Sequence, residues 1–256
     1  MDLNFKQFGQ GDPIIILHGL FGTLDNWQTI ARQLAKDYMV FIIDLRNHGR
    51  SPHTEEFGYE EMAEDLREFM EEHWIYGATI IGHSMGGKVA MLFALENPDM
   101  VNQLVVVDIT PKAYKGGHQT IFEAMFALDL PNLPDRKIAN AQLKQSIEEE
   151  GVRQFLLKNL SRSKAGGYRW KMNLPVIYEN YNKILTAIES EDTFDKPTLF
   201  IKGALSDYIS EEDLAMIQEF FPLATIETVE GAGHWVHAEQ PRHFLNTLNN
   251  FLSKNQ

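Results

Sequence analysis

The pentapeptide Gly-His-Ser-Met-Gly at residues 82–86 constrains the fold more than any other stretch of this chain. The apolar residues 78–81 precede it and residues 87–95 follow it, which predicts a strand, a sharp turn and a helix. The two glycines leave out Cβ atoms where strand and helix approach, so the bend can project the hydroxyl of Ser84. The pentapeptide alone is a weak pattern, and a purely structural turn is the alternative, but this context predicts a nucleophile elbow.

The rest of the chain predicts a mostly parallel sheet with helices on both faces, because apolar strands alternate with amphipathic helices. The expected strands are a short edge strand over 2–8, then 13–17, 38–43, 78–81, 103–107, 197–201 and 224–229. The expected helices are 25–36, 59–72, the helix that follows the elbow, 211–220 and 238–253. This alternation assigns the chain to the α/β class.

Residues 112–190 interrupt this alternation. They carry helical patterns, such as that of Phe122, Met125 and Phe126, and contain no convincing strand. Ligand sites in parallel sheets lie beyond the carboxyl ends of the strands. We therefore predict a helical cap over 112–190 above those ends, with 1–111 and 191–256 forming the core. The apolar faces of the cap either pack on the core or line a substrate pocket.

A serine hydroxyl becomes a nucleophile when a base removes its proton, and the base is a histidine held in one tautomer. His234 is the best placed of the nine histidines, because it follows the last strand and the glycine-containing residues 231–233 and precedes the last helix. His237 stands nearer that helix, and we give it little weight as the catalytic base. An ordinary surface-loop histidine is the alternative interpretation of His234.

Two aspartates are candidates for the group that orients the histidine. Asp108 ends the strand after the elbow helix, and Asp207 follows the next strand. Either one gives the chain order serine, aspartate, histidine that is known for triads on sheets of this kind. A turn or cap role is the alternative for Asp108, and a surface position is the alternative for Asp207. The residues by themselves leave the choice open.

Catalysis also requires donors for the oxyanion that forms when the serine attacks. The backbone N–H of Met85, at the start of a helix, is one expected donor. The second is expected from residues 18–22, the loop after the first apolar strand, where we choose the N–H of Leu20. His18 is expected to brace this loop through hydrogen bonds rather than act as a base.

The net charge of −13 argues against nucleic-acid partners and against docking on an anionic membrane. The chain contains no cysteine, which excludes disulfides, thiolate metal ligands and a cysteine nucleophile. No apolar run is long enough to span a bilayer, and the first residues lack the pattern of a signal peptide. These observations predict a cytoplasmic protein, and the expected serine chemistry needs neither a metal nor an organic cofactor.

Four segments in chain order together resemble the α/β-hydrolase superfamily and, more narrowly, the bacterial YbfF-type esterases. They are H-G-L-F-G at 18–22, D-L-R-N-H-G-R-S at 44–51, G-H-S-M-G-G-K at 82–88 and G-A-G-H-W-V-H-A-E at 231–239. Residues 169–175 are similar to the cap signature of that group. The resemblance implies a capped α/β-hydrolase fold and serine esterase activity on acyl esters, including acyl thioesters of coenzyme A.

The resemblance also bears on the choice of acid. Most superfamily members carry an aspartate three residues after the glycine that ends the later strand, and here that position is Ser206. YbfF-type enzymes are similar to this chain in placing the acid at the position of Asp108, which we favour, with Asp207 in reserve. Ser206 then lines the site, bonds the histidine–aspartate pair, or is an ordinary turn residue. Phe21 and Trp235 are expected to wall the pocket.

The predicted function is that of a serine carboxylesterase working through an acyl-enzyme. An acyl-CoA thioesterase is the alternative, and it would need a basic cluster near the cap to bind coenzyme A. The candidate cations are Lys112, Lys115, Arg162, Lys164, Arg169 and Lys171. The alternative that is not an enzyme is a ligand-binding protein that has kept the fold and lost turnover. The expected partner is a small ester or thioester, and both a monomer and a homodimer stay open.

Overall fold

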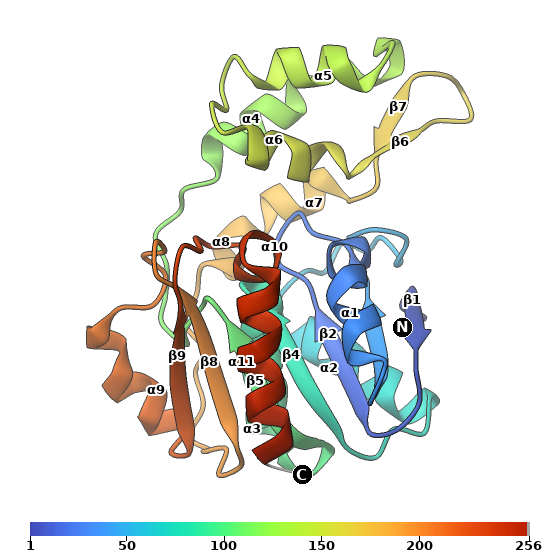
Figure 1. Cartoon of the computed structure of the whole chain (residues 1–256). Coiled ribbons are helices and arrows are strands. Elements are labelled where there is room, and N and C mark those ends of the chain that lie inside the picture. Colours follow the sequence, from blue (N-terminus) through green and yellow to red (C-terminus); the bar gives the residue numbers. More distant parts are fainter. Residues whose placement is uncertain (255–256) are drawn as a thin grey trace.

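The computed structural model describes residues 1–254 and contains a seven-stranded sheet in the order β1-β3-β2-β4-β5-β8-β9 (Figure 1). Strand β1 is antiparallel to its neighbour, and every other neighbouring pair is parallel. The strands are β1 (Phe5–Phe8), β2 (Pro13–Leu17), β3 (Met39–Ile43), β4 (Ala78–His83), β5 (Val101–Val107), β8 (Thr198–Gly203) and β9 (Ala224–Val229). All seven predicted strands are present, and the five inner strands carry the apolar runs that are buried in the sheet, whereas the edge strands β1 and β9 are only partly buried.

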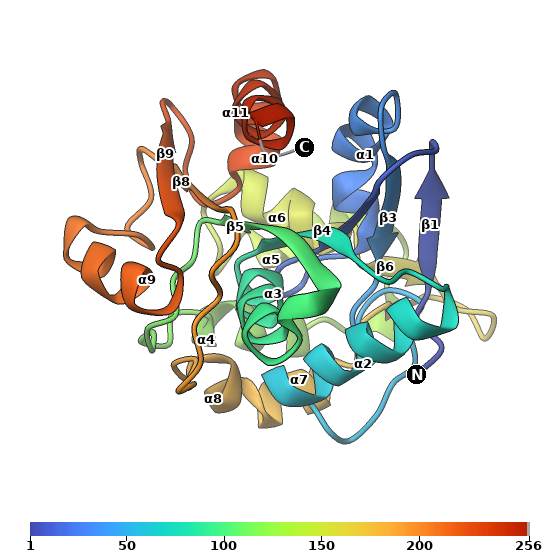
Figure 2. The same ribbon diagram turned by 90° about the horizontal axis from the view of Figure 1, so that it is seen from below.

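Helices cover both faces of this sheet. Seen from below, α1 (Gln28–Leu34) and α11 (Pro241–Lys254) lie on one face, and α2 (Tyr59–Glu72), α3 (Met85–Glu96) and α9 (Leu214–Phe220) lie on the other (Figure 2). Two hydrophobic clusters fill the two layers, one around Trp27 and Phe244 and the other around Phe69 and Phe200. The predicted α/β-hydrolase fold class is confirmed.

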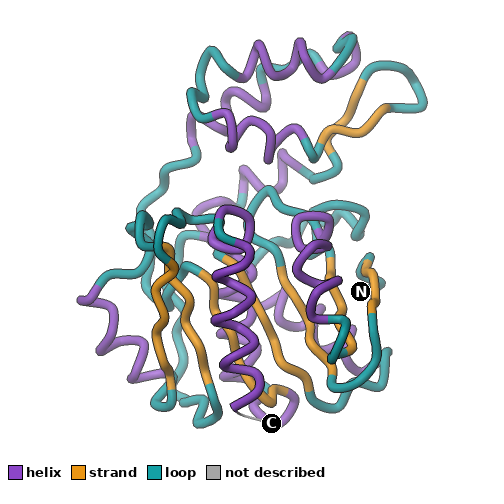
Figure 3. The backbone as a smooth tube through the Cα atoms, viewed as in Figure 1, coloured by secondary structure: helices purple, strands orange, loops and turns teal. Residues whose placement is uncertain are grey.

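The segment 112–190 forms a layer above the carboxyl ends of the parallel strands (Figure 1). Its helices are α4 (Gln119–Phe126), α5 (Arg136–Leu143), α6 (Glu150–Leu157), α7 (Leu174–Glu179) and α8 (Tyr181–Ile184). The expectation that it holds no strand is wrong, because β6 (Leu160–Arg162) and β7 (Tyr168–Trp170) form an antiparallel hairpin (Figure 3). Three-residue strands are too short to show an alternating pattern in the sequence.

Three predicted helices are divided in the structure, and one of them, expected over 211–220, is a 3₁₀ turn at Glu211–Asp213 followed by α9. The helix expected over 25–36 is a 3₁₀ turn at Leu24–Trp27 followed by α1. The last helix starts with the single turn α10 (Val236–Glu239) and continues as α11 from Pro241. Proline lacks an N–H and is favoured in a first helical turn, which explains the break before α11. Within residues 1–254, no helix combines the length and the apolar character required to cross a membrane.

The chain enters and leaves the cap through two linkers that lie side by side. The N–H of Tyr114 donates to the carbonyl of Leu185, and the N–H of Ile188 donates to the carbonyl of Pro111, both at 2.8 Å. The buried ammonium of Lys88, on α3, donates to the carbonyls of Lys112 (2.7 Å) and Thr186. One core side chain therefore fastens both linkers.

Candidate active site

The elbow has the geometry that its glycines predict. Ser84 follows β4 and precedes α3 with φ 51° and ψ −120°, in a region that residues with a side chain rarely occupy. A Cβ on Gly82 would lie 2.2 Å from the carbonyl oxygen of Gly86, and one on Gly86 would lie 2.5 Å from that of His18. Only glycine therefore allows strand, loop and helix to approach this closely.

Three side chains from distant parts of the chain meet at this bend. His234 Nε2 lies 3.0 Å from Ser84 Oγ, and His234 Nδ1 lies 2.8 Å from Asp108 Oδ2. The carboxylate of Asp108 requires the hydrogen on Nδ1, so Nε2 is the acceptor for the serine hydroxyl. The arrangement suits removal of the serine proton by the imidazole.

Asp108 is fixed by its own partners at the end of β5. Its side chain is fully buried, and its backbone has φ 53°. The N–H of Gly203 donates to Oδ1 at 3.0 Å, and the hydroxyl of Ser206 donates to Oδ2. Ser206 therefore bonds the histidine–aspartate pair, which was one of its expected positions. Asp207 is exposed, and no contact joins it to His234 in the described chain.

Two residues that sequence reasoning missed also hold His234. The ring of Tyr208 stacks on its imidazole, with centroids 3.9 Å apart. His83 Nε2 lies 2.8 Å from the backbone carbonyl oxygen of His234. Burial lowers the pKa of His83 well below its usual range, so its ring is neutral and donates one N–H to that carbonyl. The place of His83 inside the pentapeptide was a usable signal, whereas nothing in the sequence marked Tyr208.

The two residues expected to supply the oxyanion donors line the same cavity as Ser84. Met85 is the first residue of α3, where a helix leaves its N–H groups without an intrahelical partner. Leu20 lies in the loop after β2, which closes through a hydrogen bond from the N–H of Gly22 to the carbonyl of Gly19 (2.9 Å). Leu20 and Met85 therefore stay the predicted oxyanion donors.

His18 braces the same loop. The N–H of Leu45 donates to His18 Nε2 at 3.0 Å, so Nδ1 carries the hydrogen and donates to the carbonyl of Gly19 at 2.9 Å. Burial lowers the pKa of His18 to about 4. A neutral ring with both nitrogens engaged is suited to join two loops and not to act as a base.

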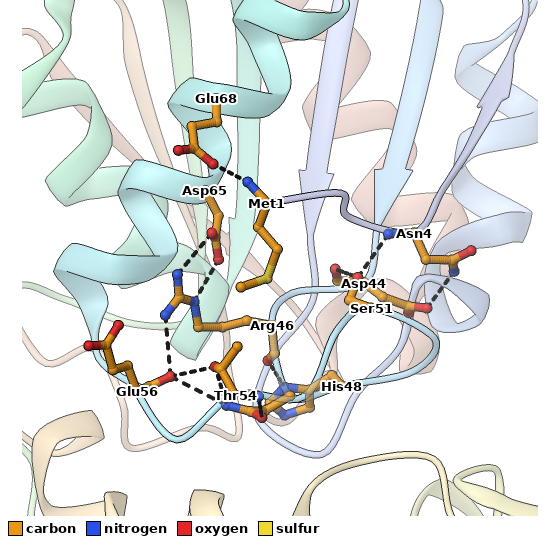
Figure 4. A network of polar contacts seen from close by, with 11 residues as sticks. Met1, Asn4, Asp44, Arg46, His48, Ser51, Thr54, Glu56, Asp65 and Glu68 are labelled. Carbon is orange, nitrogen blue, oxygen red and sulfur yellow. Dashed lines mark hydrogen bonds and ion pairs between the residues drawn. The ribbon is translucent and has the colours of Figure 1, made fainter.

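Hydrogen bonds hold the loop of residues 44–56 after β3 and join it to Asn4 and to Asp65 on α2 (Figure 4). Arg46 donates two hydrogen bonds to Asp65, of 2.6 and 2.9 Å, and both side chains are buried. Asp44 accepts a hydrogen bond from the side chain of Asn4 (Figure 4) and another from the N–H of Arg50. Arg46 and the neighbouring His48 line none of the described cavities and serve to anchor this loop.

A cavity of about 700 Å³ opens above Ser84 between the core and the cap. Its walls are mainly apolar, and Phe21 and Trp235 belong to them as expected. Of the six proposed cations, Lys112 and Lys115 line it, and Lys112 is paired with Asp213 at 2.6 Å. Within the described residues, no group of three or more histidines and carboxylates is placed to hold a metal ion.

A capped α/β sheet with this arrangement of serine, histidine and aspartate defines a protein of the α/β-hydrolase class. The family model described as alpha/beta hydrolase fold matches residues 12–241, and the chain belongs to this family. Esterase YbfF of Escherichia coli is 39% identical over 242 residues, covering 94% of this chain and 93% of its own. The resemblance found in the sequence is thereby confirmed.

Other relatives agree with this family. The zebrafish protein named sn-1-specific diacylglycerol lipase ABHD11 is 41% identical over 263 residues, which cover 98% of this chain and 83% of that protein. The solved structure titled "Marine microorganism esterase" superposes with a TM-score of 0.95 at 44% identity, covering 97% of this chain and 98% of that one.

Proposed function

We propose that this protein is a serine carboxylesterase in which Ser84 is the nucleophile, His234 the general base and Asp108 the group that orients the imidazole. The observation that carries the proposal is the unbroken series of hydrogen bonds from Ser84 through His234 to Asp108, at the floor of an apolar cavity. Relatives named as esterases and as a diacylglycerol lipase support the ester as the substrate class.

The reaction has two balanced halves. His234 takes the proton of Ser84 as Oγ bonds to the ester carbonyl carbon, and the amides of Leu20 and Met85 stabilise the oxyanion. The bond to the leaving oxygen then breaks, and that oxygen receives the proton from His234. Water attacks the acyl-enzyme in the same way and releases the acid, which regenerates the Ser84 hydroxyl.

The cavity favours an oxygen ester over an acyl-CoA thioester. Coenzyme A carries several phosphate charges, and the six cations proposed for it are not gathered at one place. Lys112 is paired with Asp213, Lys171 lies 4.0 Å from Asp25, and the guanidinium of Arg162 lies over the ring of Tyr168. A cytoplasmic location stays a prediction from the sequence.

Labelling with a fluorophosphonate tests the proposal. We expect one covalent adduct, mapped to Ser84 by peptide mass spectrometry, and loss of both adduct and esterase activity in Ser84→Ala. Folded wild-type protein that hydrolyses no ester and forms no adduct would exclude the proposed chemistry. Rates on matched oxygen esters and CoA thioesters at low salt should favour the oxygen esters.

A further inference from the structure

The imidazole of His234 is bonded at both nitrogens, to Asp108 through Nδ1 and to Ser84 through Nε2. These two bonds place the nitrogens, and the plane of the ring is set by what packs on its faces. Hydrogen bonds weaken steeply when donor, hydrogen and acceptor leave a straight line. A group that sets the plane of the ring therefore acts on both bonds at once.

Tyr208 is the residue that covers a face of this imidazole. The two ring centroids lie 3.9 Å apart, and the two planes differ by 19°. The other ring contacts of His234 within residues 1–254 are to His83, at 4.7 Å and 44°, and to Trp235, at 6.0 Å and 61°. Neither of these rings is parallel to the imidazole. Tyr208 therefore sets its plane and turns the face of a π-system toward it.

Tyr208 is itself held from several sides. Its N–H donates to Ser206 Oγ at 3.3 Å, and its carbonyl accepts a hydrogen bond from the hydroxyl of Tyr114 at 2.8 Å. The ring of Tyr114 lies behind that of Tyr208, with centroids 5.2 Å apart. The Tyr114 hydroxyl also accepts a hydrogen bond from the N–H of Thr110 at 2.9 Å. Tyr208 is thereby tied to the segment that carries Asp108.

Three other histidines interact electrostatically with His234, and all three are uncharged near neutral pH. Burial lowers the pKa of His118 to about 4 and that of His237 to about 3, and it lowers the pKa of His83 well below its usual range. Burial also raises the pKa of the Tyr208 phenol, which keeps its proton. None of these groups repels a positive charge on the imidazole.

Asp108 is the carboxylate that contacts the imidazole, at its edge. The ammonium of Lys112, on the cavity wall, is paired with Asp213 at 2.6 Å. The remaining charged residues nearby are exposed, and water screens them: Lys115, Asp207 and Glu239. The face of an aromatic ring attracts a cation, more strongly where water is excluded. Tyr208 is half-buried on the wall of a mainly apolar cavity, which meets that condition.

We propose that Tyr208 is a positioning residue of the reaction: it sets the plane of the His234 imidazole and stabilises the imidazolium that forms when Ser84 attacks. The inference rests on the proposed esterase function. The proton passes from Ser84 Oγ to Nε2 and then to the leaving oxygen, and water repeats the transfer in the second half. The imidazolium forms in both halves, so Tyr208 acts in both. Tyr208 gains and loses no proton and acts through His234.

Two substitutions separate the ring of Tyr208 from its hydroxyl. Tyr208→Phe keeps an aromatic face, and the hydroxyl makes no hydrogen bond within residues 1–254. Tyr208→Leu removes the face and leaves an apolar side chain on the cavity wall. We would measure kcat and KM on ethyl butyrate and ethyl octanoate, and kcat/KM from pH 5 to pH 9.

We expect Tyr208→Leu to lower kcat about tenfold on both esters, with KM within about twofold of wild type. The acidic limb of the kcat/KM profile should move to lower pH by about 0.5–1, because the imidazolium loses a stabilising contact. Tyr208→Phe should recover most of the lost kcat and restore the acidic limb. A displaced imidazole alone would slow the reaction without moving that limb.

The inference is overturned if the acidic limb does not move in Tyr208→Leu, or if the loss differs between the two esters. Tyr208→Phe as slow as Tyr208→Leu would overturn it as well, because the aromatic face would then have no effect. Failure of the esterase function shows elsewhere, in wild-type protein that forms no fluorophosphonate adduct on Ser84.

A fluorinated series keeps the test valid if Tyr208→Leu does not fold. Phenylalanine with one, two or three ring fluorines at position 208 retains the shape of the ring and withdraws electrons from its face. The attraction to a cation weakens with each fluorine. We expect kcat to fall stepwise along the series, about two- to threefold per fluorine. Equal kcat values across the series would contradict stabilisation of the imidazolium by the ring.

Discussion

The core and the cap contribute different things to the site. Ser84, Asp108 and His234 all belong to the core: Ser84 and Asp108 directly follow the buried strands β4 and β5, and His234 lies in the loop after the edge strand β9. Residues 112–190 supply half of the residues that line the cavity above Ser84, but none of the hydrogen bonds among the three groups. From this comparison we infer that the sheet sets the reaction and the cap sets which substrates reach it.

The two regions nevertheless meet at defined bonds. The amide of Asn159 donates to the carbonyl of Phe21 at 2.6 Å, and the N–H of Asn173 donates to the carbonyl of Asn47 at 2.8 Å. Each bond joins a cap residue to a core loop that supports the site. Changes confined to one region can therefore test how separate the two contributions are.

The largest expected effect tests the core. Asp108→Asn should lower kcat by about 10⁴-fold, because an amide stabilises the wrong tautomer of His234. Asp207→Asn is the matched control and should stay within about twofold of wild type, since Asp207 is exposed and makes no bond to the imidazole. Steady-state rates on ethyl butyrate measure both. Equal losses in the two variants would contradict the assignment of the acid.

The next effect tests the cap. Phe122 is fully buried and packs on Phe21 and Tyr181 with ring centroids 5.1 Å apart in both cases. Phe122→Ala should reduce the free energy of unfolding by about 3–5 kcal/mol. Limited proteolysis should then cut within 112–190 first, and octanoate esters should lose more kcat/KM than acetate esters.

Phe200→Ala is the matched change in the core, because Phe200 is also fully buried. It should lower the rates on both esters equally and give no early cut in the cap. If Phe122→Ala and Phe200→Ala behave alike in proteolysis and in chain-length preference, the cap and the core unfold as one unit. That result would contradict separate contributions of the two regions.

Acid should weaken the core through its buried histidines. Burial lowers the pKa of His18 to about 4 and of His48 and His237 to about 3, while the cap holds one comparable residue, His118. Below pH 6.5 the unfolded chain binds protons that these folded rings exclude, so the free energy of unfolding falls as pH falls. Between its folded and its unfolded pKa, each ring lowers the free energy of unfolding by about 1.4 kcal/mol for each pH unit of acidification.

The variant His48→Gln isolates one such ring. It should remove about 2.5 kcal/mol of the stability loss between pH 6 and pH 4. Urea unfolding at both pH values measures the difference. An unchanged pH dependence would show that His48 is not a buried neutral ring in the folded protein.

The smallest effect concerns the fastening of the linkers. Burial lowers the pKa of Lys88 to about 7, below its value in the unfolded chain. At pH values between 7 and the higher pKa of Lys88 in the unfolded chain, the unfolded chain binds a proton that the folded chain lacks, so the free energy of unfolding rises with pH. Lys88→Met should remove about 1 kcal/mol of this rise between pH 8 and pH 9, as measured by urea unfolding. A slope that persists in Lys88→Met would contradict a lowered pKa of Lys88.

Much of the core follows from local rules that the sequence displays. Long apolar strands and the glycine-bounded elbow predict the sheet, the bend at Ser84 and the strand ends where Asp108 and His234 stand. The stacking of Tyr208 on His234 depends on how loops meet after folding, which no spacing reveals, whereas the place of His83 next to Ser84 was a usable signal for its bond to the backbone of His234. The β6–β7 hairpin was missed because its strands are short and packing, not pattern, stabilises them.

The most direct test of the central claim is a rapid-mixing experiment with an activated acetate ester. We expect a burst of one equivalent of alcohol per protein, followed by a slower phase, with the acetyl group mapped to Ser84 in protein quenched during the burst. The burst and the acetyl group should both be absent in Ser84→Ala. An acetyl group on another residue, or turnover that survives in Ser84→Ala, would contradict the account.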